Sequence, residues 1–511
     1  MSFALPSIDF SKLEQLFYYN SKEPLLFNTG FFVWLFAAFM VGYGLVYRAN
    51  FMRTLYLTLF SLLFYYKSGG LIVFMLIGST LADFLIGERI YQAEGKVRKK
   101  LWVTLSLLIN VGALVYFKYA GFILQNVGID TESLSNILNG NISEELHSWV
   151  GYFNLDHMIL PVGISFFTFQ KLSYTIDIYR GQLKPTKSLL DYAFFVTFFP
   201  HLVAGPIVRA ADFLPQIRKP AFISKEDFGR AVFLIAVGLF KKAVISDYIS
   251  TNFVDRVFDD PSLYTGLENM VAVYAYALVI YCDFSGYSDM AIGIAQMLGY
   301  TLKPNFASPY KSGSITEFWR RWHMSLSFWL RDYVYISLGG NRNGKFMQYV
   351  NQMITMLIGG LWHGAAWQFI LWGALHGAAL GADKAIRTVI TIPKNTVMRI
   401  LGIALTFNFV CFCWIYFRAP SIDIAHQVMG RIVYNFHPEI LSSFVAGYQN
   451  VILLMVIGYA MHFTPQRSKN FVQESITKTP LLGKAALILV VAYIVIQVKS
   501  AEIQPFIYFQ F

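Results

Sequence analysis

The sequence predicts an all-α protein embedded in a membrane by many helices. Of its 511 residues, 56% are hydrophobic, 17% are aromatic and only 14% are charged. Soluble domains carry about 25% charged residues, so this chain has too little polar surface for water. A membrane-spanning helix needs roughly 20 mostly apolar residues, and such stretches recur along the whole chain. Composition and recurrence together favour a multi-pass membrane protein.

Apolar stretches divide the chain into about eleven or twelve embedded segments. We treat residues 28–500 as one membrane domain, with an N-terminal segment at 1–27 that is outside or interfacial and an aromatic tail at 501–511. The N-terminal segment lacks the basic start and compact apolar core of a signal peptide. The expected embedded segments are 28–47, 52–66, 69–87, 101–120, 158–173, 229–246, 268–282, 284–300, 350–378, 398–417, 447–463 and 482–498.

The net charge of +11 is distributed as in a membrane protein rather than a nucleic-acid-binding one. Cytoplasmic loops are enriched in Lys and Arg, which places the basic connectors inside. The loops at 121–157, 247–266 and 418–446 hold mostly acidic charges and belong outside, together with both termini. The basic connectors are Arg48/Arg53, Lys96 to Lys100, Arg180 to Lys187, Arg209 to Lys225, Lys303 to Arg342, Lys384 to Arg399 and Arg467 to Lys484.

Two apolar segments are expected to enter and leave the membrane on the same side, because basic connectors flank both of their ends. The segment 191–207 contains two prolines and a glycine that interrupt helical hydrogen bonding. Broken backbone at membrane depth is tolerated only where it is buried in protein or lines a wet cavity. The segment 350–378 has a pair of glycines in its middle and is expected to dip in the same way.

His363 is the leading candidate for chemistry, because it lies in an otherwise apolar run from Ile358 to Trp367. Ionisable side chains are costly there and are often functional. An interhelical hydrogen bond, worth only about 1 kcal/mol, fits the same pattern. A metal site shared with His376 is not expected, because their separation along a helix would be about 20 Å.

Other buried side chains have structural explanations that fit at least as well as functional ones. His201 lies between two prolines, where both a hydrogen bond to freed backbone and a catalytic role fit. His376 fits a histidine packed between helices. The cysteines are expected to be small core residues, which suggests neither disulfide bonds nor a metal. They are Cys282, Cys411 and Cys413.

The densest group of polar and aromatic residues lies at 314–335. Thr316 followed by Glu317 suits a helix start, which would place Trp319 and His323 on one face as i, i+4 neighbours. An interfacial helix with an aromatic belt explains most of this pattern. A cytosolic mouth that binds a phosphate-bearing donor explains it as well. The basic residues of the group are Arg320, Arg321 and Arg331.

Two carboxylates, Asp283 and Asp289, lie within an apolar stretch. Buried acids need partners. We expect a structural role for both, through nearby hydroxyl groups or ion pairs with Arg320 or Arg321.

Five stretches occur in a fixed order: Leu160 to Gln170, Phe199 to Ile207, Asp283 to Met290, Glu317 to Gly340, and Gly360 to Gly364. Together they resemble the membrane-bound O-acyltransferase (MBOAT) superfamily, and specifically its bacterial branch that O-acetylates exported polysaccharides. The resemblance covers most of the chain. It implies an MBOAT-like funnel from the cytosol to a buried catalytic histidine, which His363 matches, and a second family histidine, which His323 matches.

The resemblance also implies a reaction. A thioester donor such as acetyl-CoA would bind from the cytosol, and its phosphates would meet basic side chains. Neutral His363 would act as general base on an acceptor hydroxyl, while His323 would position the donor or stabilise the oxyanion. The candidate donor-binding residues are Arg320, Arg321, Lys311 and Trp319.

The last residues, 505–511, resemble a C-terminal aromatic hexapeptide of this branch. Tyr508 is a candidate acyl carrier, although an aromatic anchor at the interface fits the same residues. In this branch, acetyl usually passes to a separate periplasmic or extracytoplasmic O-acetyltransferase that modifies the polymer. The resemblance therefore implies a bacterial inner membrane, a protein partner and a polysaccharide acceptor.

Two alternatives of different kinds are retained. A transporter or flippase would use buried His and Asp residues for proton coupling, but no inverted repeat is apparent. Transfer of D-alanine to teichoic acid, or of another acyl group to a secreted protein or lipid, would keep the enzyme class and change the substrate.

Overall fold

The computed structural model describes residues 18–20, 24–129, 160–391, 393, 395–498 and 506. Within these ranges the chain is helical and contains no strand, which confirms the predicted all-α class. By length and composition, four stretches are able to cross a membrane, or up to six if each of two bent helix pairs is one span. Most of the other predicted segments that the structure describes form shorter or broken helices. The four stretches are Asn50–Gln92, Lys96–Asn126, Gly266–Met297 and Thr396–Arg418.

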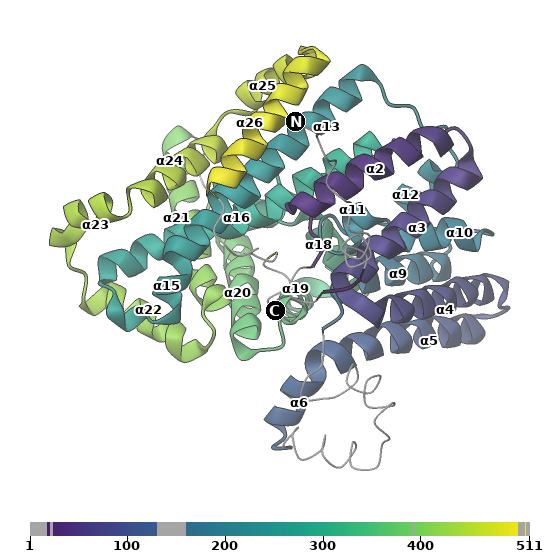
Figure 1. Cartoon of the computed structure of the whole chain (residues 1–511). Helices are drawn as coiled ribbons and strands as arrows, with labels where there is room; N and C mark the ends of the chain where they lie inside the picture. The colour runs from purple at the N-terminus through teal and green to yellow at the C-terminus, as the bar shows by residue number, and fades with distance from the viewer. Residues whose placement is uncertain are drawn as a thin grey trace, which may run out of the picture.

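The N-terminal helices pack as a bundle on one side of the molecule (Figure 1). Inside it, Asp83 accepts a hydrogen bond from Ser106 at 2.7 Å and lies 3.7 Å from the Lys171 ammonium. These partners satisfy a fully buried carboxylate. The helices are α2 (Gly30–Val46), α3 (Asn50–Gly69), α4 (Val73–Gln92), α5 (Lys96–Leu114), α6 (Ala120–Asn126), α9 (Ile164–Tyr179), α10 (Leu189–Thr197), α11 (Phe199–Leu202) and α12 (Ala210–Ile217).

The break predicted in 191–207 is confirmed. Helix α10 ends at Thr197, Phe198 leaves the helical conformation, and the short α11 follows. The Nε2 atom of His201 lies 3.0 Å from the carbonyl oxygen of Phe195. This carbonyl is in the last turn of α10, where the helix supplies no amide partner for it. His201 therefore has the structural role that its position allowed. The surrounding phenylalanines are fully buried, so the broken backbone is enclosed in protein as expected.

Helix α16 (Gly266–Met297) crosses the centre of the fold without interruption for 32 residues. The sequence predicted two segments here, 268–282 and 284–300, and that division is wrong. Asp283, which lies between the two predicted segments, and Asp289 are both neutralised inside the protein. Asp283 pairs with Lys242 at 2.6 Å and Asp289 with Lys241 at 2.7 Å. The expected pairing of these acids with arginines from 314–335 is likewise wrong.

Both lysines come from the turn that continues α13 (Lys225–Leu239) as a π-helix, η4 (Phe240–Ser246). A π-helical turn carries one extra residue and often lies at functional sites. Here it directs two consecutive lysines toward α16. Further short helices follow, namely α14 (Asp247–Ile249), η5 (Ser250–Val254), α15 (Asp255–Asp259), α17 (Ile315–Trp319), α18 (Met324–Trp329) and η8 (Leu330–Tyr335).

Residues 344–389 form an antiparallel hairpin of α19 (Gly344–His363) and α20 (Trp367–Val389). The predicted reversal in this region is therefore confirmed. A Cβ atom on Gly360 would lie 2.2 Å from the Phe369 carbonyl oxygen, and one on Gly373 would lie 2.5 Å from that of Met356. Only glycine permits so close an approach, which is the small-residue packing typical of membrane helices.

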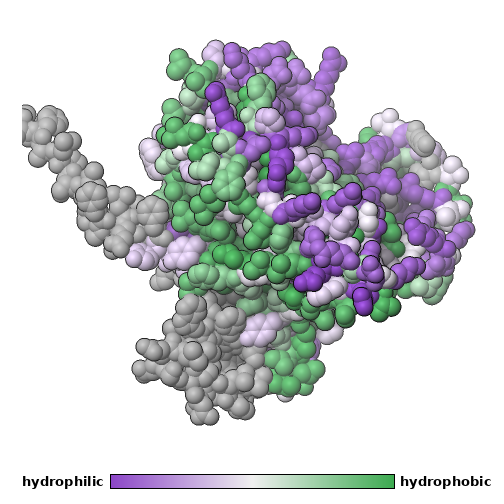
Figure 2. Space-filling model, turned by 90° about the vertical axis from the view of Figure 1, so that its right-hand side faces the viewer, coloured by the Kyte–Doolittle hydropathy of each residue, from purple (hydrophilic) through white to green (hydrophobic). Residues whose placement is uncertain are grey.

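The C-terminal helices lie on the opposite side from the N-terminal bundle (Figure 1). They pack against α13 and α16. Figure 2 shows hydrophobic residues over the centre and lower part of one face and hydrophilic residues mostly at its top and right-hand side, as expected for a protein that presents an apolar surface to lipid. The helices are α21 (Thr396–Arg418), α22 (Ile422–Tyr434), α23 (Leu441–Gly447), α24 (Gln449–Phe463), α25 (Gln466–Lys478) and α26 (Leu481–Val498).

Candidate active site

His363 is the last residue of α19 and lies at the tip of the hairpin, with 2% of its surface exposed. Aromatic rings surround it. Its imidazole is 5.1 Å from the ring of Trp372 and 5.1 Å from that of Phe417, both in edge-to-face contact. The adjacent Trp362 ring lies 5.0 Å away. This environment keeps bulk water away from the imidazole and strengthens any polar interaction that a substrate makes with it.

His323 is brought near the same place from a different part of the chain. It is fully buried, 4.5 Å from the ring of Phe284 and 5.8 Å from that of Trp362. Trp362 therefore contacts both histidines. The structure unites the two residues that the family resemblance singled out.

The local structure around His323 differs from the predicted helix. Helix α17 begins at Ile315, capped by the side chain of Ser314 rather than starting at Thr316 as predicted, and it ends at Trp319. His323 has φ of 40°, a left-handed conformation that is uncommon outside glycine, and α18 begins after it. The expectation that Trp319 and His323 share one helix face is therefore wrong, because the left-handed residue turns the imidazole toward Phe284. Strained backbone of this kind persists where the surroundings hold it.

Asn305 is the residue that holds this turn in place. Its side-chain oxygen accepts a hydrogen bond of 2.8 Å from the Ser325 hydroxyl, and its amide donates to the Gly205 carbonyl at 3.2 Å. Its own carbonyl accepts from the Met324 amide at 2.9 Å. Asn305 thus ties the His323 turn to the broken segment near α11. No local pattern in the sequence marked it.

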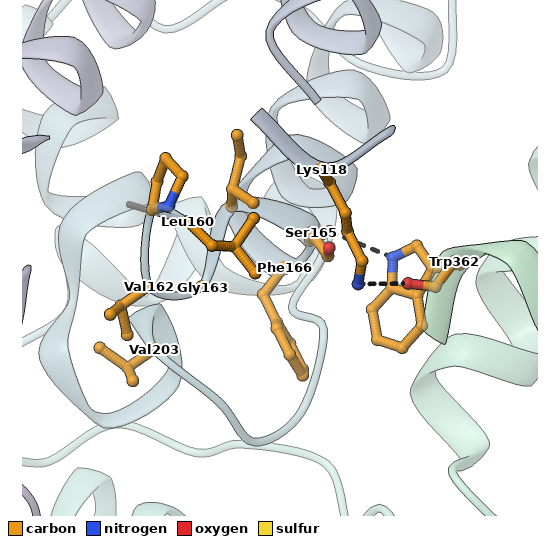
Figure 3. Close-up of a pocket in the computed structure, with 10 residues that line it drawn as sticks. Lys118, Leu160, Val162, Gly163, Ser165, Phe166, Val203 and Trp362 are labelled. Atoms are coloured by element: carbon orange, nitrogen blue, oxygen red, sulfur yellow. Dashed lines mark hydrogen bonds between the residues drawn. The ribbon is translucent and has the colours of Figure 1, made fainter. Parts of the chain in front are cut away.

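Lys118 and Tyr119 fix the end of α19 that carries His363, and Figure 3 shows the bond from Lys118 to Trp362. The Lys118 ammonium donates to the carbonyl groups of Trp362 at 3.0 Å and His363 at 2.8 Å, and the Tyr119 hydroxyl donates to the Leu361 carbonyl at 2.7 Å. The last carbonyls of a helix lack helical partners, and a cation is favourable at that end. Both donors lie in a π-helical turn, η2 (Val115–Tyr119). Sequence reasoning missed them.

We expect Lys118→Met to lower turnover by about tenfold or more, because it leaves two buried carbonyl groups without a donor at the point that orients His363. Lys118→Arg keeps donors at this position and should retain more activity. Turnover per amount of membrane-inserted protein measures both. Wild-type turnover by Lys118→Met would show that the end of α19 does not need this cap.

A small cavity of about 50 Å³ adjoins Lys118 and Trp362 (Figure 3). The start of α9 forms its opposite wall with Gly163, Ser165 and Phe166. The Trp362 indole donates to the Ser165 carbonyl at 3.4 Å across it. The cavity is large enough for a few water molecules or a small acyl group.

The four candidate donor-binding residues have different surroundings. Arg320 is exposed and has no ion pair among the described residues. Arg321 pairs with Glu317 at 2.9 Å, and the Lys311 ammonium donates to the Thr464 carbonyl at 2.7 Å. The Trp319 indole donates to a ring nitrogen of His376 at 3.3 Å, so His376 is a packed core histidine with one hydrogen bond.

Arg320 lines an open cavity of about 780 Å³ together with Arg387 and Arg399. Glu317 lies among them and bonds Arg399 at 2.8 Å. Burial would raise the pKa of Glu317, but the hydrogen bonds from Arg399 and the Gly313 amide outweigh it and hold the pKa below its usual value. Glu317 therefore stays charged and orders its arginine neighbours, while Arg320 remains available to an anion.

A series of aromatic contacts leads from beside this cavity to His363. Trp319, which directly precedes the lining residue Arg320 in the sequence, lies 5.6 Å from the ring of Trp372, which in turn contacts His363. Of the described residues that line the cavity, none is His363. The basic cavity and the enclosed His363 are therefore separate in the part of the chain that the structure describes, and the expected funnel between them stays a prediction.

The C-terminal tail reaches the interior at its one described residue. Phe506 has 1% of its surface exposed, and its ring lies 5.4 Å from Phe284 and 5.1 Å from Tyr287. Phe284 is also the ring that contacts His323. The predicted carrier, Tyr508, lies outside the described residues.

This fold and this site define a class: a multi-pass helical membrane enzyme with a buried histidine at the tip of a hairpin and a basic mouth at one side. Comparison with known proteins identifies the family within this class. The chain belongs to the membrane-bound O-acyltransferase (MBOAT) family, whose model matches residues 180–422, a range that includes both His323 and His363. The protein is therefore an O-acyltransferase.

Several relatives resemble the chain well beyond that range. It is 36% identical to the probable alginate O-acetylase AlgI of Azotobacter vinelandii, over 95% of this chain and 100% of the relative. It is also 36% identical to the peptidoglycan O-acetyltransferase of Helicobacter pylori, over 80% of each. The teichoic acid D-alanyltransferase of Bacillus subtilis is 30% identical over 53% of this chain and 71% of its own length.

Proposed function

We propose that this protein takes an acetyl group from a cytosolic thioester, acetyl-CoA or a similar donor, and delivers it across a bacterial inner membrane for O-acetylation of an exported polysaccharide. The observation that carries the proposal is the meeting of His363 and His323 on either side of Trp362, enclosed by aromatic rings. The full-length similarity to an alginate O-acetylase supports the polysaccharide acceptor. The D-alanyltransferase likeness covers about half of the chain and supports it less.

In the proposed reaction, the acceptor oxygen attacks the acyl carbonyl while the His363 imidazole takes the hydroxyl proton. The new C–O bond forms, the C–S bond breaks, and the proton passes from His363 to the departing thiolate. His323 positions the donor or stabilises the oxyanion, since its strained turn is clamped by Asn305. The ring enclosure keeps water from hydrolysing the thioester.

The tail is proposed to relay the acetyl group. Phe506 anchors it one aromatic ring away from His323, and Tyr508 follows two residues later. Acetyl would pass first to the Tyr508 hydroxyl and then to a separate extracytoplasmic transferase that modifies the polymer. Such a partner would bind the protein on its outer side.

The proposal is tested by the acetyl-ester content of the exported polysaccharide in cells with and without this protein. Acetyl ester should appear only when the protein is present together with its partner. An unchanged ester content in cells that lack the protein would refute the proposed substrate class.

Donor binding is proposed at the arginine-lined cavity. We expect Arg320→Gln to raise the KM for acetyl-CoA by about tenfold with little change in kcat, because a charged hydrogen bond to phosphate is lost. Initial rates in inside-out membrane vesicles measure this. Arg342→Gln, which removes an exposed charge from the same connector outside the cavity, serves as the control. Equal KM values for Arg320→Gln and wild type would place the donor elsewhere.

A further inference from the structure

A second cavity, of about 400 Å³, lies among α13, α16, α24 and α25. Its volume falls within the roughly 300–1,000 Å³ typical of small-molecule sites. Neither His323 nor His363 is among the described residues that line it. The proposed acetyl transfer assigns it no role.

The lining of this cavity has an apolar part and a polar part. The apolar part comes from α13, η4 and α24 and includes Phe233, Val237, Ile245 and Met461. The polar part gathers near the start of α25 and includes His462, Ser308, Lys469 and Gln473. A ligand that matches both parts carries a polar head and an apolar tail.

His462 supplies a buried hydrogen-bond donor at the polar part. It has 1% of its surface exposed, and its Nε2 accepts a hydrogen bond from the Tyr310 amide at 3.1 Å. The proton of the neutral ring is therefore on Nδ1. Among the described residues, nothing accepts from that nitrogen. A buried donor without an acceptor is unfavourable. Almost none of this nitrogen's surface is accessible, so a ligand oxygen would reach it after a small movement of the side chains around it.

The charge at this end is positive. Lys469 donates to the Ser308 hydroxyl at 3.0 Å and to the His462 carbonyl at 3.3 Å, and it has no carboxylate partner in the described part of the chain. Lys241 is neutralised by Asp289, the one carboxylate among the described lining residues. The lining thus carries one uncompensated cation beside a free N–H group, which favours an anionic head.

Helix α25 places this polar end at the expected level of the membrane surface. It is bent by 120° from α26, and it exposes Phe471 and Val472 alongside charged residues. A short amphipathic helix between two apolar ones is typical of an element that lies in the interface plane. Basic pockets between helices at that level bind anionic lipid headgroups.

We propose that this cavity binds the headgroup of an anionic phospholipid, whose phosphate accepts hydrogen bonds from Lys469 and from Nδ1 of His462 while its acyl chains cover the apolar part. A soluble phosphate ligand would offer the same acceptors but would leave the apolar part uncovered. The site is separate from the residues proposed for acetyl transfer, so the result of its test does not depend on the proposed function.

The test uses the purified full-length protein in neutral detergent, with thermal unfolding followed as lipid is added. Phosphatidylglycerol should raise the Tm, while phosphatidylethanolamine, inorganic phosphate and coenzyme A should raise it much less. Lys469→Gln should raise the half-saturating phosphatidylglycerol concentration about fivefold or more. This is the effect expected from the loss of one basic residue near a lipid surface. Lys478→Gln removes the same charge from the same helix outside the cavity and should behave as wild type.

Gln473→Glu provides a second variant that keeps the side-chain shape and adds a negative charge to the lining. It should also weaken phosphatidylglycerol binding, and it decides the matter if Lys469→Gln protein does not fold. A wild-type response by Gln473→Glu, or by a folded Lys469→Gln protein, would overturn the proposal. Equal stabilisation by coenzyme A or inorganic phosphate would replace the lipid with a soluble anion, and equal stabilisation by phosphatidylethanolamine would remove the need for an anionic head.

Discussion

We expect cells that make His363→Ala protein at wild-type membrane abundance to export polysaccharide without detectable acetyl ester. A positioned general base contributes about 10²- to 10⁴-fold to a rate. The described rings that contact His363 belong to Trp362, Trp372 and Phe417, and none of these side chains is able to take a proton. Only His323 or a bound water molecule could replace His363 as the base. Ester content of the polymer and a membrane blot for abundance measure the result.

Two further histidine variants separate chemistry from packing. His363→Gln fills much of the same space and keeps a polar group but is no base, so it should be as inactive as His363→Ala. His201→Gln changes another fully buried histidine, and its amide is able to replace the hydrogen bond to the Phe195 carbonyl. It should retain acetylation. Substantial acetylation by His363→Gln would overturn the general-base assignment.

The sequence was sufficient where the signal is local. Pro200 predicted the break between α10 and α11, because a proline itself prevents a helical hydrogen bond. The reversal expected in 350–378 is present but lies after His363, whereas the glycines that suggested it stay inside α19 and allow the close packing of α20. The buried position of His363 also follows from the apolar run around it.

The sequence was insufficient where distant segments meet. Lys118 bonds a carbonyl 244 residues away, and no pattern near Lys118 indicates that contact. Asp283 seemed to interrupt a helix because its partner, Lys242, comes from another one. His323 seemed helical because its left-handed conformation depends on the Asn305 clamp rather than on its own propensity. Contacts between residues far apart in the chain determine these features, and one sequence alone does not show which distant residues meet.

The second large effect is expected at the tail. Tyr508→Phe should lower acetylation of the exported polymer by about 100-fold or more, because it removes only the hydroxyl that would carry the acetyl group. An unperturbed phenol has a pKa of about 10 and is a weak nucleophile at neutral pH, so its reaction would need a base such as His363. The buried Phe506 ring would keep the altered tail in place, since the substitution leaves that anchor intact.

Two measurements distinguish a carrier from an anchor at Tyr508. In cells that lack the partner transferase, mass spectrometry of the C-terminal peptide should find acetyl on wild-type protein and none on the Tyr508→Phe or His363→Ala proteins. Phe506→Leu weakens the anchor without touching the hydroxyl, so it should reduce polymer acetylation by a smaller factor and still give acetylated peptide. Full polymer acetylation by Tyr508→Phe would end the relay hypothesis and leave direct transfer from the thioester, with the tail reduced to an aromatic plug beside Phe284.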